Sequence, residues 1–222
     1  MKKYSIKSAF VNAGFGAWYP KGSERLERSM IYHGCSHEML FTREPFADMD
    51  TSKPYRIKYH ALKKAIEQGY THIIWLDCSL WFTRSPNELM DKLNHDGGFF
   101  IQSGYNLAQT CNDNDLVFGK LNRDEAELLP EMWTCIFGFN LLTDKGQKFW
   151  HYVEQAFNVG VFDTPRDHAN GSADPRYLHA RQDQTAVSLA YHLSGYDCAF
   201  PPNGIVADYK DNEHSLLFRQ GL

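Results

Sequence analysis

The sequence predicts an α/β fold in which a mostly parallel central sheet is flanked by helices. Segments with strand character alternate with segments of helical periodicity, which is the pattern of β-α-β units. Residues 73–76 form an apolar run without polar alternation, as in a strand covered on both faces of a parallel sheet. The chain has 222 residues, of which 43% are hydrophobic, so one sizeable core is feasible. We therefore expect a single domain, with its core over about residues 5–202 and a C-terminal tail over residues 203–222.

The N-terminal part is expected to fold as two successive strand and helix pairs. A first strand is predicted over residues 5–11, followed by a turn that contains Gly14 and a helix over residues 23–33. A short strand at residues 39–42 and a helix at residues 54–68 come next. The glycines of the first turn lack the spacing of the GxGxxG fingerprint, so the sequence does not predict a dinucleotide site.

The C-terminal part is expected to continue this alternation. Pro86 suits the first turn of a helix, and Thr143 suits a helix N-cap. Residues 159–182 are rich in Gly, Pro, Asp, Arg and His, as is typical of a binding loop or lid. The elements expected here are a helix from residue 85 to about 97, a strand at 99–102, short helical pieces at 114–121 and 124–132, a strand at 133–142, and helices at 144–157 and 186–193.

Charge and cysteine content argue against several kinds of protein. A formal net charge of -4 gives no electrostatic reason to expect a nucleic acid or an anionic membrane as an obligatory partner. The apolar runs are shorter than the roughly 20 residues of a membrane span, and the N-terminus lacks the apolar core of a signal peptide. Five cysteines without a CxxC pair indicate reduced thiols rather than a disulfide framework or a cysteine zinc site. We therefore expect a cytoplasmic protein.

Two acidic residues stand where a parallel sheet binds its ligands. Asp77 directly follows the buried strand at residues 73–76, and ligands bind at the carboxyl ends of such strands. A carboxylate there can hold a divalent cation that neutralises a diphosphate, or it can cap the next turn or pair with Arg84. Asp183 is expected at the start of the last helix, facing the same crevice. There it serves either the site or the favourable interaction of a carboxylate with the helix dipole.

Several motifs together resemble nucleotide-sugar glycosyltransferases of the GT-A fold. They are the glycine turn after the first strand, the WLDCS motif at Trp75–Ser79, the GFNLL strand at Gly138–Leu142, and RQDQTAVSLA at Arg181–Ala190. The resemblance covers about residues 5–202 and implies a single-domain, Rossmann-like GT-A fold. It implies transfer of a hexosyl or pentosyl group from a nucleotide-sugar donor to an acceptor hydroxyl.

The resemblance also implies a metal site. In the family, a DxD motif holds a manganese or magnesium ion on the diphosphate, and this motif corresponds here to Asp77, Cys78 and Ser79. Because Ser79 replaces the second acidic residue, another ligand is expected, or the metal affinity is weak or absent. His214 in the tail is the candidate, since such enzymes often add a late histidine ligand. The alternative is an exposed histidine in a polar terminal segment. The tail over residues 203–222 is separately expected to close over the site.

The remaining predicted site residues bind the donor or take part in the transfer. Asn12, Gly14 and Arg56 are expected beside Asp77 and Ser79 in donor binding, with Arg56 preferred to the neighbouring Lys53, Lys58 and Arg84 for contact with the phosphates. Asp183 and Gln184 correspond to a late Asp-Gln motif beside the transferred sugar. In an inverting reaction Asp183 would be the general base, whereas in a retaining reaction it would support the sugar.

The acceptor is expected to contact the basic loop before the last helix, through Arg176, His179 and Arg181. A saccharide, a protein, a small molecule and a hydroxylated nucleic-acid base all remain possible acceptors. Two other classes of protein also remain open. A nucleotidyltransferase would be expected to carry a basic phosphate loop after its first strand, but Lys21 is the only basic residue among residues 14–22. A non-catalytic module that binds nucleotide sugars or glycans would explain the serine at position 79.

Overall fold

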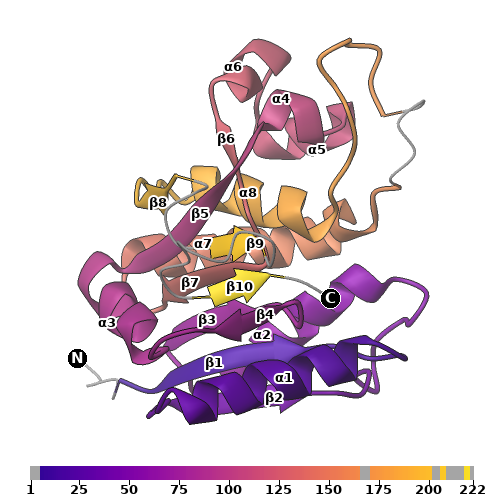
Figure 1. Cartoon of the computed structure of the whole chain (residues 1–222). Helices are drawn as coiled ribbons and strands as arrows, with labels where there is room; N and C mark the ends of the chain where they lie inside the picture. The colour runs from indigo at the N-terminus through magenta and orange to yellow at the C-terminus, as the bar shows by residue number, and fades with distance from the viewer. Residues whose placement is uncertain (1–5, 166–170, 202–205, 209–217, 221–222) are drawn as a thin grey trace.

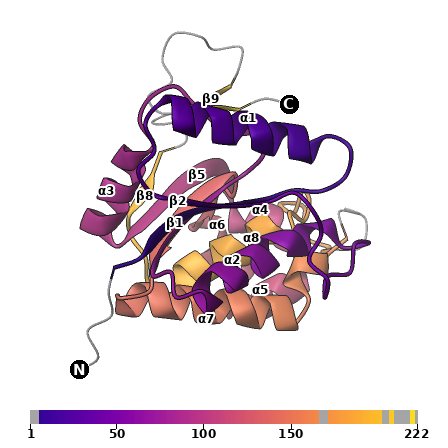
Figure 2. The same ribbon diagram turned by 90° about the horizontal axis from the view of Figure 1, so that it is seen from below.

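The computed structural model describes residues 6–165, 171–201, 206–208 and 218–220. In this part of the chain, a seven-stranded sheet lies between two layers of helices (Figures 1 and 2). The order of its main path is β2-β1-β3-β7-β5-β6, and β8 pairs with β5. Its strands are β1 (Ser8–Ala13), β2 (Glu38–Thr42), β3 (His72–Leu76), β5 (Gly98–Asn106), β6 (Pro130–Met132), β7 (Ile136–Asn140) and β8 (Ala199–Phe200).

Most strands of this sheet point the same way, as the sequence predicts. β1 pairs in parallel with β2 and β3, and β8 pairs in parallel with β5. β7 is antiparallel to both of its neighbours, β3 and β5, so β3 and β5 share one direction. The carboxyl ends of β1, β3 and β5 therefore meet at one edge of the sheet, together with the amino end of β7.

Helices cover both faces of the sheet. Figure 2 shows α1 on one side of β1 and β2, and α2 and α7 on the other side. α3 packs on the same face as α1, and α8 packs with α2 and α7. No helix in the described part of the chain has the length and apolar character needed to cross a membrane. These helices are α1 (Tyr19–Tyr32), α2 (Ile57–Glu67), α3 (Asn87–Asp96), α7 (Asp144–Asn158) and α8 (Asp183–Leu193).

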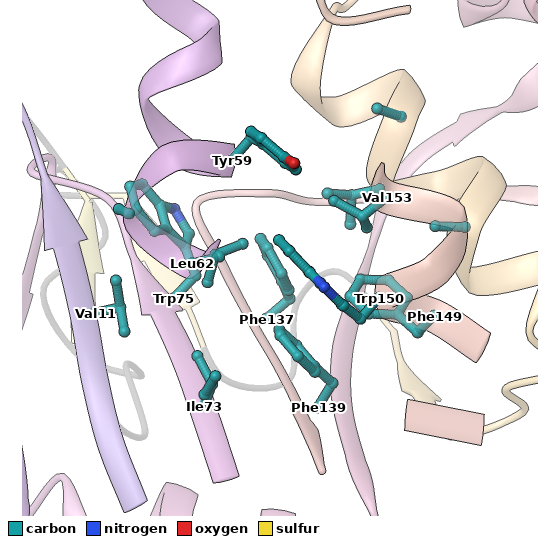
Figure 3. Close-up of a cluster of buried hydrophobic side chains, with 14 of the residues drawn as sticks. Val11, Tyr59, Leu62, Ile73, Trp75, Phe137, Phe139, Phe149, Trp150 and Val153 are labelled. Carbon is teal, nitrogen blue, oxygen red and sulfur yellow. The ribbon is translucent and has the colours of Figure 1, made fainter. Parts of the chain in front are cut away.

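The alternation of side chains along the central strands produces these two layers. Phe10 and Ile74 pack toward α1 and α3, whereas Val11, Ile73 and Trp75 pack toward the opposite helices. Figure 3 shows this second cluster, in which the rings from β3 and β7 face aromatic side chains of α2 and α7. Each large apolar side chain that is fully buried contributes about 1.5–3 kcal/mol. The central strands are thus anchored on both faces.

Three short helices form a small subdomain beyond α8. They are α4 (Leu107–Thr110), α5 (Asp113–Gly119) and α6 (Arg123–Glu127), and they lie at the top of Figure 1. Each begins with an asparagine N-cap that forms a capping box. Such caps satisfy the free N–H groups of helices too short to be stable alone.

The predicted helix at residues 124–132 is wrong over its last part. α6 ends at Glu127, and Pro130–Met132 instead forms β6, which pairs antiparallel with β5. The cause is β5, which extends to Asn106, beyond the predicted strand at residues 99–102, and offers an edge to pair with. The N-cap role of Thr143 is confirmed, since its hydroxyl accepts a hydrogen bond from Gly146 N.

Several other boundaries differ from the predicted ones. α1 already begins at Tyr19, with Pro20 in its first turn, rather than at residue 23. β1 spans Ser8–Ala13 instead of residues 5–11. A short 3-10 helix, η1 (Pro54–Arg56), precedes α2, and another, η2 (Val161–Asp163), follows α7.

A second, three-stranded sheet joins the tail to the segment after Ser79. It has the order β4-β10-β9, with β4 at Leu80–Phe82, β9 at Val206–Asp208 and β10 at Phe218–Gln220. β10 pairs antiparallel with β4, which begins directly after Ser79. The backbone of the described tail therefore lies beside the DxD-like motif. His214 falls outside the described residues.

Candidate active site

A cavity of about 400 Å³ opens at the sheet edge where β1 and β3 end. The turn after β1, the start of α2, the motif after β3 and the start of α8 enclose it. Its aromatic lining comes from Phe15, Tyr19, Tyr55 and Trp75. The predicted residues Gly14, Asp77, Ser79 and Asp183 all contribute to the lining. The structure thus brings the two predicted carboxylates to one cavity.

The turn after β1 packs directly against the DxD-like motif. The side-chain amide of Asn12 is buried and donates to Leu76 O at 2.7 Å and to Cys78 Sγ at 3.4 Å. A Cβ at Gly14 would lie 2.5 Å from Cys78 Sγ, so a larger residue would push the turn away from the motif. Burial raises the pKa of the Cys78 thiol to about 11, which keeps it neutral near pH 7. Asn12 therefore supports the motif from beneath, whereas Gly14 lines the cavity.

Asp77 presents its carboxylate to the cavity, with 35% of its side chain exposed. Its Oδ1 accepts a hydrogen bond from Trp75 Nε1 at 2.7 Å and lies 3.5 Å from Lys58 Nζ. Burial and repulsion by Asp183 raise its pKa, while Lys58 acts in the opposite direction. Arg84, the alternative partner, lies beside Glu88 instead, with 3.7 Å between Nη2 and Oε2.

Asp183 is the first residue of α8, and 13% of its side chain is exposed. Its Oδ2 lies 2.6 Å from Lys58 Nζ and accepts a hydrogen bond from Thr134 Oγ1 at 3.3 Å. The preceding residue, Gln182, has φ +44°, a conformation unfavourable for a residue with a Cβ. Its buried amide donates to Thr164 O at 2.9 Å. Such strain persists where surrounding contacts hold it, and here it lies directly before Asp183.

Lys58 lies between the two carboxylates of the cavity, although the sequence analysis preferred Arg56. The Lys58 side chain is only 5% exposed, and its Nζ donates to Thr134 O at 2.7 Å. The ammonium group lies 5.0 Å from the centre of the Trp75 ring. Burial lowers its pKa, but the attraction of Asp183 and Asp77 exceeds this effect, so the net pKa is raised. Lys58 is therefore a buried cation.

The sequence contained a signal for this lysine. Lys58 lies three, four and seven positions before Ala61, Leu62 and Ala65, all of which are buried on α2. That spacing places residues on one face of a helix. A lysine on the buried face of a helix needs a charged partner, whereas a lysine on the solvent face does not.

Arg56 and Gln184, which were predicted in the site, do not line the cavity. Arg56 forms a bidentate ion pair with Asp163, with 2.7 Å between Nε and Oδ1, and does not line the cavity. Gln184 is buried, and its Nε2 donates to Glu131 Oε2 at 2.6 Å. Both have roles in the surrounding structure, and a direct role in donor binding or catalysis stays a prediction.

The predicted acceptor residues divide into two groups. Arg181 lies 3.3 Å from Glu131 Oε2 and has its guanidinium 5.5 Å from the centre of the Tyr105 ring. His179 also contacts this ring, with 5.7 Å between the ring centres. Arg176 forms ion pairs elsewhere, with carboxylates of Asp174, Asp124 and Glu127.

The residues that line the cavity can be compared with the ligands that a divalent cation requires. No group of three His, Cys, Asp or Glu side chains that could hold a metal is found among the described residues. Asp77 Oδ2 accepts no hydrogen bond from a described residue, and Ser79 lies nearby in the lining. A magnesium-type ion often binds through one or two carboxylates, substrate phosphates and water. Asp77 and Ser79 therefore fit an ion that arrives with a diphosphate, while His214, the third predicted ligand, lies outside the described residues.

Comparisons with known proteins point to one type of fold. No family model and no curated protein matches the chain. The chain is similar to a crystal structure of a glycosyltransferase involved in the glycosylation of the major capsid of PBCV-1, with a TM-score of 0.56 and 11% sequence identity. The similarity covers 96% of this chain and 93% of the other. The chain thus shares the α/β fold of a glycosyltransferase over nearly its whole length.

Proposed function

We propose that the chain is a glycosyltransferase that moves a sugar from a nucleotide-sugar donor to an acceptor hydroxyl. The observation that carries this proposal is the cavity at the ends of β1 and β3, into which Asp77 and Asp183 project on either side of Lys58. Its volume of about 400 Å³ is in the range of small-molecule sites. The similarity of fold to a glycosyltransferase supports the same reaction class.

The proposed chemistry assigns the two carboxylates to different parts of the donor. In glycosyl transfer the anomeric carbon becomes oxocarbenium-like while a nucleoside diphosphate leaves. Asp77 and Ser79, beside the turn after β1, are assigned to the diphosphate, and the aromatic lining to the nucleoside. The N-terminus of α1 lies at the same turn and contributes the positive end of a helix dipole.

Asp183 is assigned to the transferred sugar and the acceptor hydroxyl. Lys58 and Thr134 hold one oxygen of its carboxylate, and the strained Gln182 directly precedes it. As a general base it would take the proton of the acceptor hydroxyl, and in a retaining reaction it would support the positive charge on the sugar.

A bound manganese or magnesium ion would neutralise the charge that develops on the leaving diphosphate. Asp77 is its proposed ligand, with Ser79 nearby and His214 as a further candidate. The cavity's described charged lining, Lys58, Asp77 and Asp183, contains one cation and two anions. An anionic diphosphate therefore needs additional positive charge at this site.

The proposed acceptor surface favours an uncharged acceptor over a nucleic acid. Arg181 faces the buried carboxylate of Glu131, and Arg176 faces three carboxylates. These arginines do not form a basic patch of the kind that binds phosphates. Tyr105, 39% exposed and adjacent to Arg181, supplies an aromatic face for a saccharide or another hydroxylated acceptor.

The proposal is tested by thermal shift with a panel of sugar nucleotides, followed by chromatography of the incubated donor. We expect one sugar nucleotide to raise the melting temperature and then to be consumed in the presence of manganese. A donor that binds but remains intact would favour the non-catalytic binding module. If no sugar nucleotide binds, the proposal is wrong.

The nucleotidyltransferase alternative has less support. Lys21, the basic residue after the first strand, lies 5.2 Å from the centre of the exposed Trp18 ring and does not line the cavity. The described part of this turn therefore brings no basic side chain toward a phosphate in the cavity.

A further inference from the structure

The ammonium group of Lys58 occupies a position lined by three oxygen atoms. They are Asp183 Oδ2 at 2.6 Å, Thr134 O at 2.7 Å and Asp77 Oδ1 at 3.5 Å. We propose that Lys58 is the resident cation of this site and acts as a positioning residue that holds the two carboxylates at a fixed separation. For the reaction this role rests on the proposed function, because it assigns Asp77 to the donor and Asp183 to the acceptor side.

The surroundings of the Lys58 side chain hold this cation in place. The centres of the Trp75 and Phe137 rings lie 5.0 and 5.9 Å from Nζ. These two residues pair across β3 and β7, and Figure 3 shows both rings on the sheet face that carries α2. Aromatic faces stabilise a desolvated cation. The three oxygens equal in number the three donors of an ammonium group: Asp183 Oδ2 and Thr134 O lie at hydrogen-bond distance, and Asp77 Oδ1 lies at ion-pair distance.

The resident cation explains why one acidic residue can be absent from the motif. Asp77 and Asp183 together already place two negative charges around one position, and Lys58 neutralises one of them. A third carboxylate at position 79 would raise the negative charge in a cavity that must receive a diphosphate. Serine at this position adds an oxygen without adding a charge.

Lys58 also restricts how a divalent cation can bind. With the ammonium group in place, one oxygen of each carboxylate is engaged, so each has one oxygen left, Oδ2 of Asp77 and Oδ1 of Asp183. A single carboxylate oxygen binds a divalent cation weakly in water, so such an ion needs the oxygens of the donor diphosphate as well. We therefore expect weak metal binding to the wild-type chain when no donor is present.

The substitution Lys58→Met should convert the position into a metal site. A methionine side chain is one atom shorter than lysine and fills the same apolar space, but it leaves the position of the ammonium group vacant. Two of the surrounding oxygens lie at 2.6 and 2.7 Å from that position. These distances are close to the 2.3–2.6 Å of calcium coordination, and manganese also prefers carboxylate and carbonyl oxygens.

The experiment is a calorimetric titration with manganese chloride alone, without a sugar nucleotide. We expect Lys58→Met to bind manganese at least tenfold more tightly than the wild type. The matched control is Lys63→Met, which makes the same change on the exposed side of α2 and should bind like the wild type. The double variant Lys58→Met/Asp183→Asn removes one ligand and should return the affinity to the wild-type level.

Thermal melting of the same variants supplies a second measurement. Manganese should raise the melting temperature of Lys58→Met and leave that of Lys63→Met unchanged. If Lys58→Met is unfolded in buffer, recovery of a cooperative transition in manganese supports the proposal. The proposal is overturned if folded Lys58→Met gains no manganese affinity. It is also overturned if Lys58→Met is unfolded and manganese does not stabilise it.

The outcome is independent of whether the chain transfers sugar. Failure of every sugar nucleotide to bind would refute the proposed function, while the manganese titration would still measure the role of Lys58. Conversely, an active enzyme whose Lys58→Met variant gains no metal affinity would keep the proposed function and lose the resident cation.

Discussion

Replacing Asp183 by asparagine separates the two sides of the candidate site. The substitution preserves the size of the side chain but removes the charge that faces Lys58 at 2.6 Å. Both Lys58 Nζ and Thr134 Oγ1 contact the same atom, Oδ2, so the amide oxygen of asparagine can still accept from them, but only as a neutral acceptor. The variant therefore tests both stability and catalysis.

The magnitudes follow from these contacts. A hydrogen bond to a charged group contributes about 1.5–3 kcal/mol. Because Lys58 keeps Thr134 O and Asp77 as partners, we expect the free energy of unfolding to fall by about 2 kcal/mol. Loss of a positioned general base lowers turnover by about 10²- to 10⁴-fold. Donor affinity should be unchanged, since Asp77 and the aromatic lining remain.

Three measurements test this prediction: urea unfolding for stability, calorimetry for donor affinity and product formation for turnover. The matched control is Asp197→Asn, at a side chain that is 84% exposed and pairs with Lys145, and all three quantities should stay at wild-type values. Loss of donor binding together with activity would place Asp183 in the nucleotide site. Turnover near the wild-type level would refute its catalytic role.

Three further predictions concern the motif, the metal and a buried acid. Asp77→Asn should abolish transfer and weaken donor binding in a folded protein, whereas Ser79→Ala should have a smaller effect; an active Asp77→Asn variant would contradict the assignment. EDTA should lower both activity and donor affinity, and added manganese or magnesium should restore them. The His214→Ala variant should show a weaker restoration. Full activity in the presence of chelator would exclude metal assistance. Burial raises the pKa of Asp115 from 3.8 to about 6. The folded state then holds this proton more tightly than the unfolded state, so stability should fall by about 3 kcal/mol as pH rises from about 4 to above 6. In urea unfolding, Asp115→Asn should remove this part of the dependence of stability on pH. An Asp115→Asn variant with the pH profile of the wild type would contradict the prediction.

The main architecture could be predicted from local patterns. An apolar run without polar alternation identifies β3, and helical spacing identifies α2 and α7. The rule that ligands bind at the carboxyl ends of parallel strands placed Asp77 at a cavity, and the start of α8 placed Asp183 at the same one.

The parts that could not be predicted depend on contacts between distant segments. β4 and β6 are each three residues long, too short for a periodic signal, and form only because β10 and β5 offer partners. The helical spacing marks Lys58 as a residue on the buried face of α2, but deciding between Lys58 and Arg56 at the cavity also required the orientation of α2 on the sheet. Local sequence does not encode that orientation, and the carboxylate that engages Arg56 lies 107 positions away.

The reversed direction of β7 has a consequence for the order of folding. Because the amino end of this strand meets the carboxyl ends of β1 and β3, Thr134 reaches Lys58 across 76 positions of the chain. Asn12 and Leu76 are joined across 64 positions. Closing such long loops is slow and gains nothing until the distant strands have paired. The oxygen-lined position around Lys58 should therefore form only in the late stages of folding, so that ligand binding reports the completed native sheet and not a partly folded intermediate.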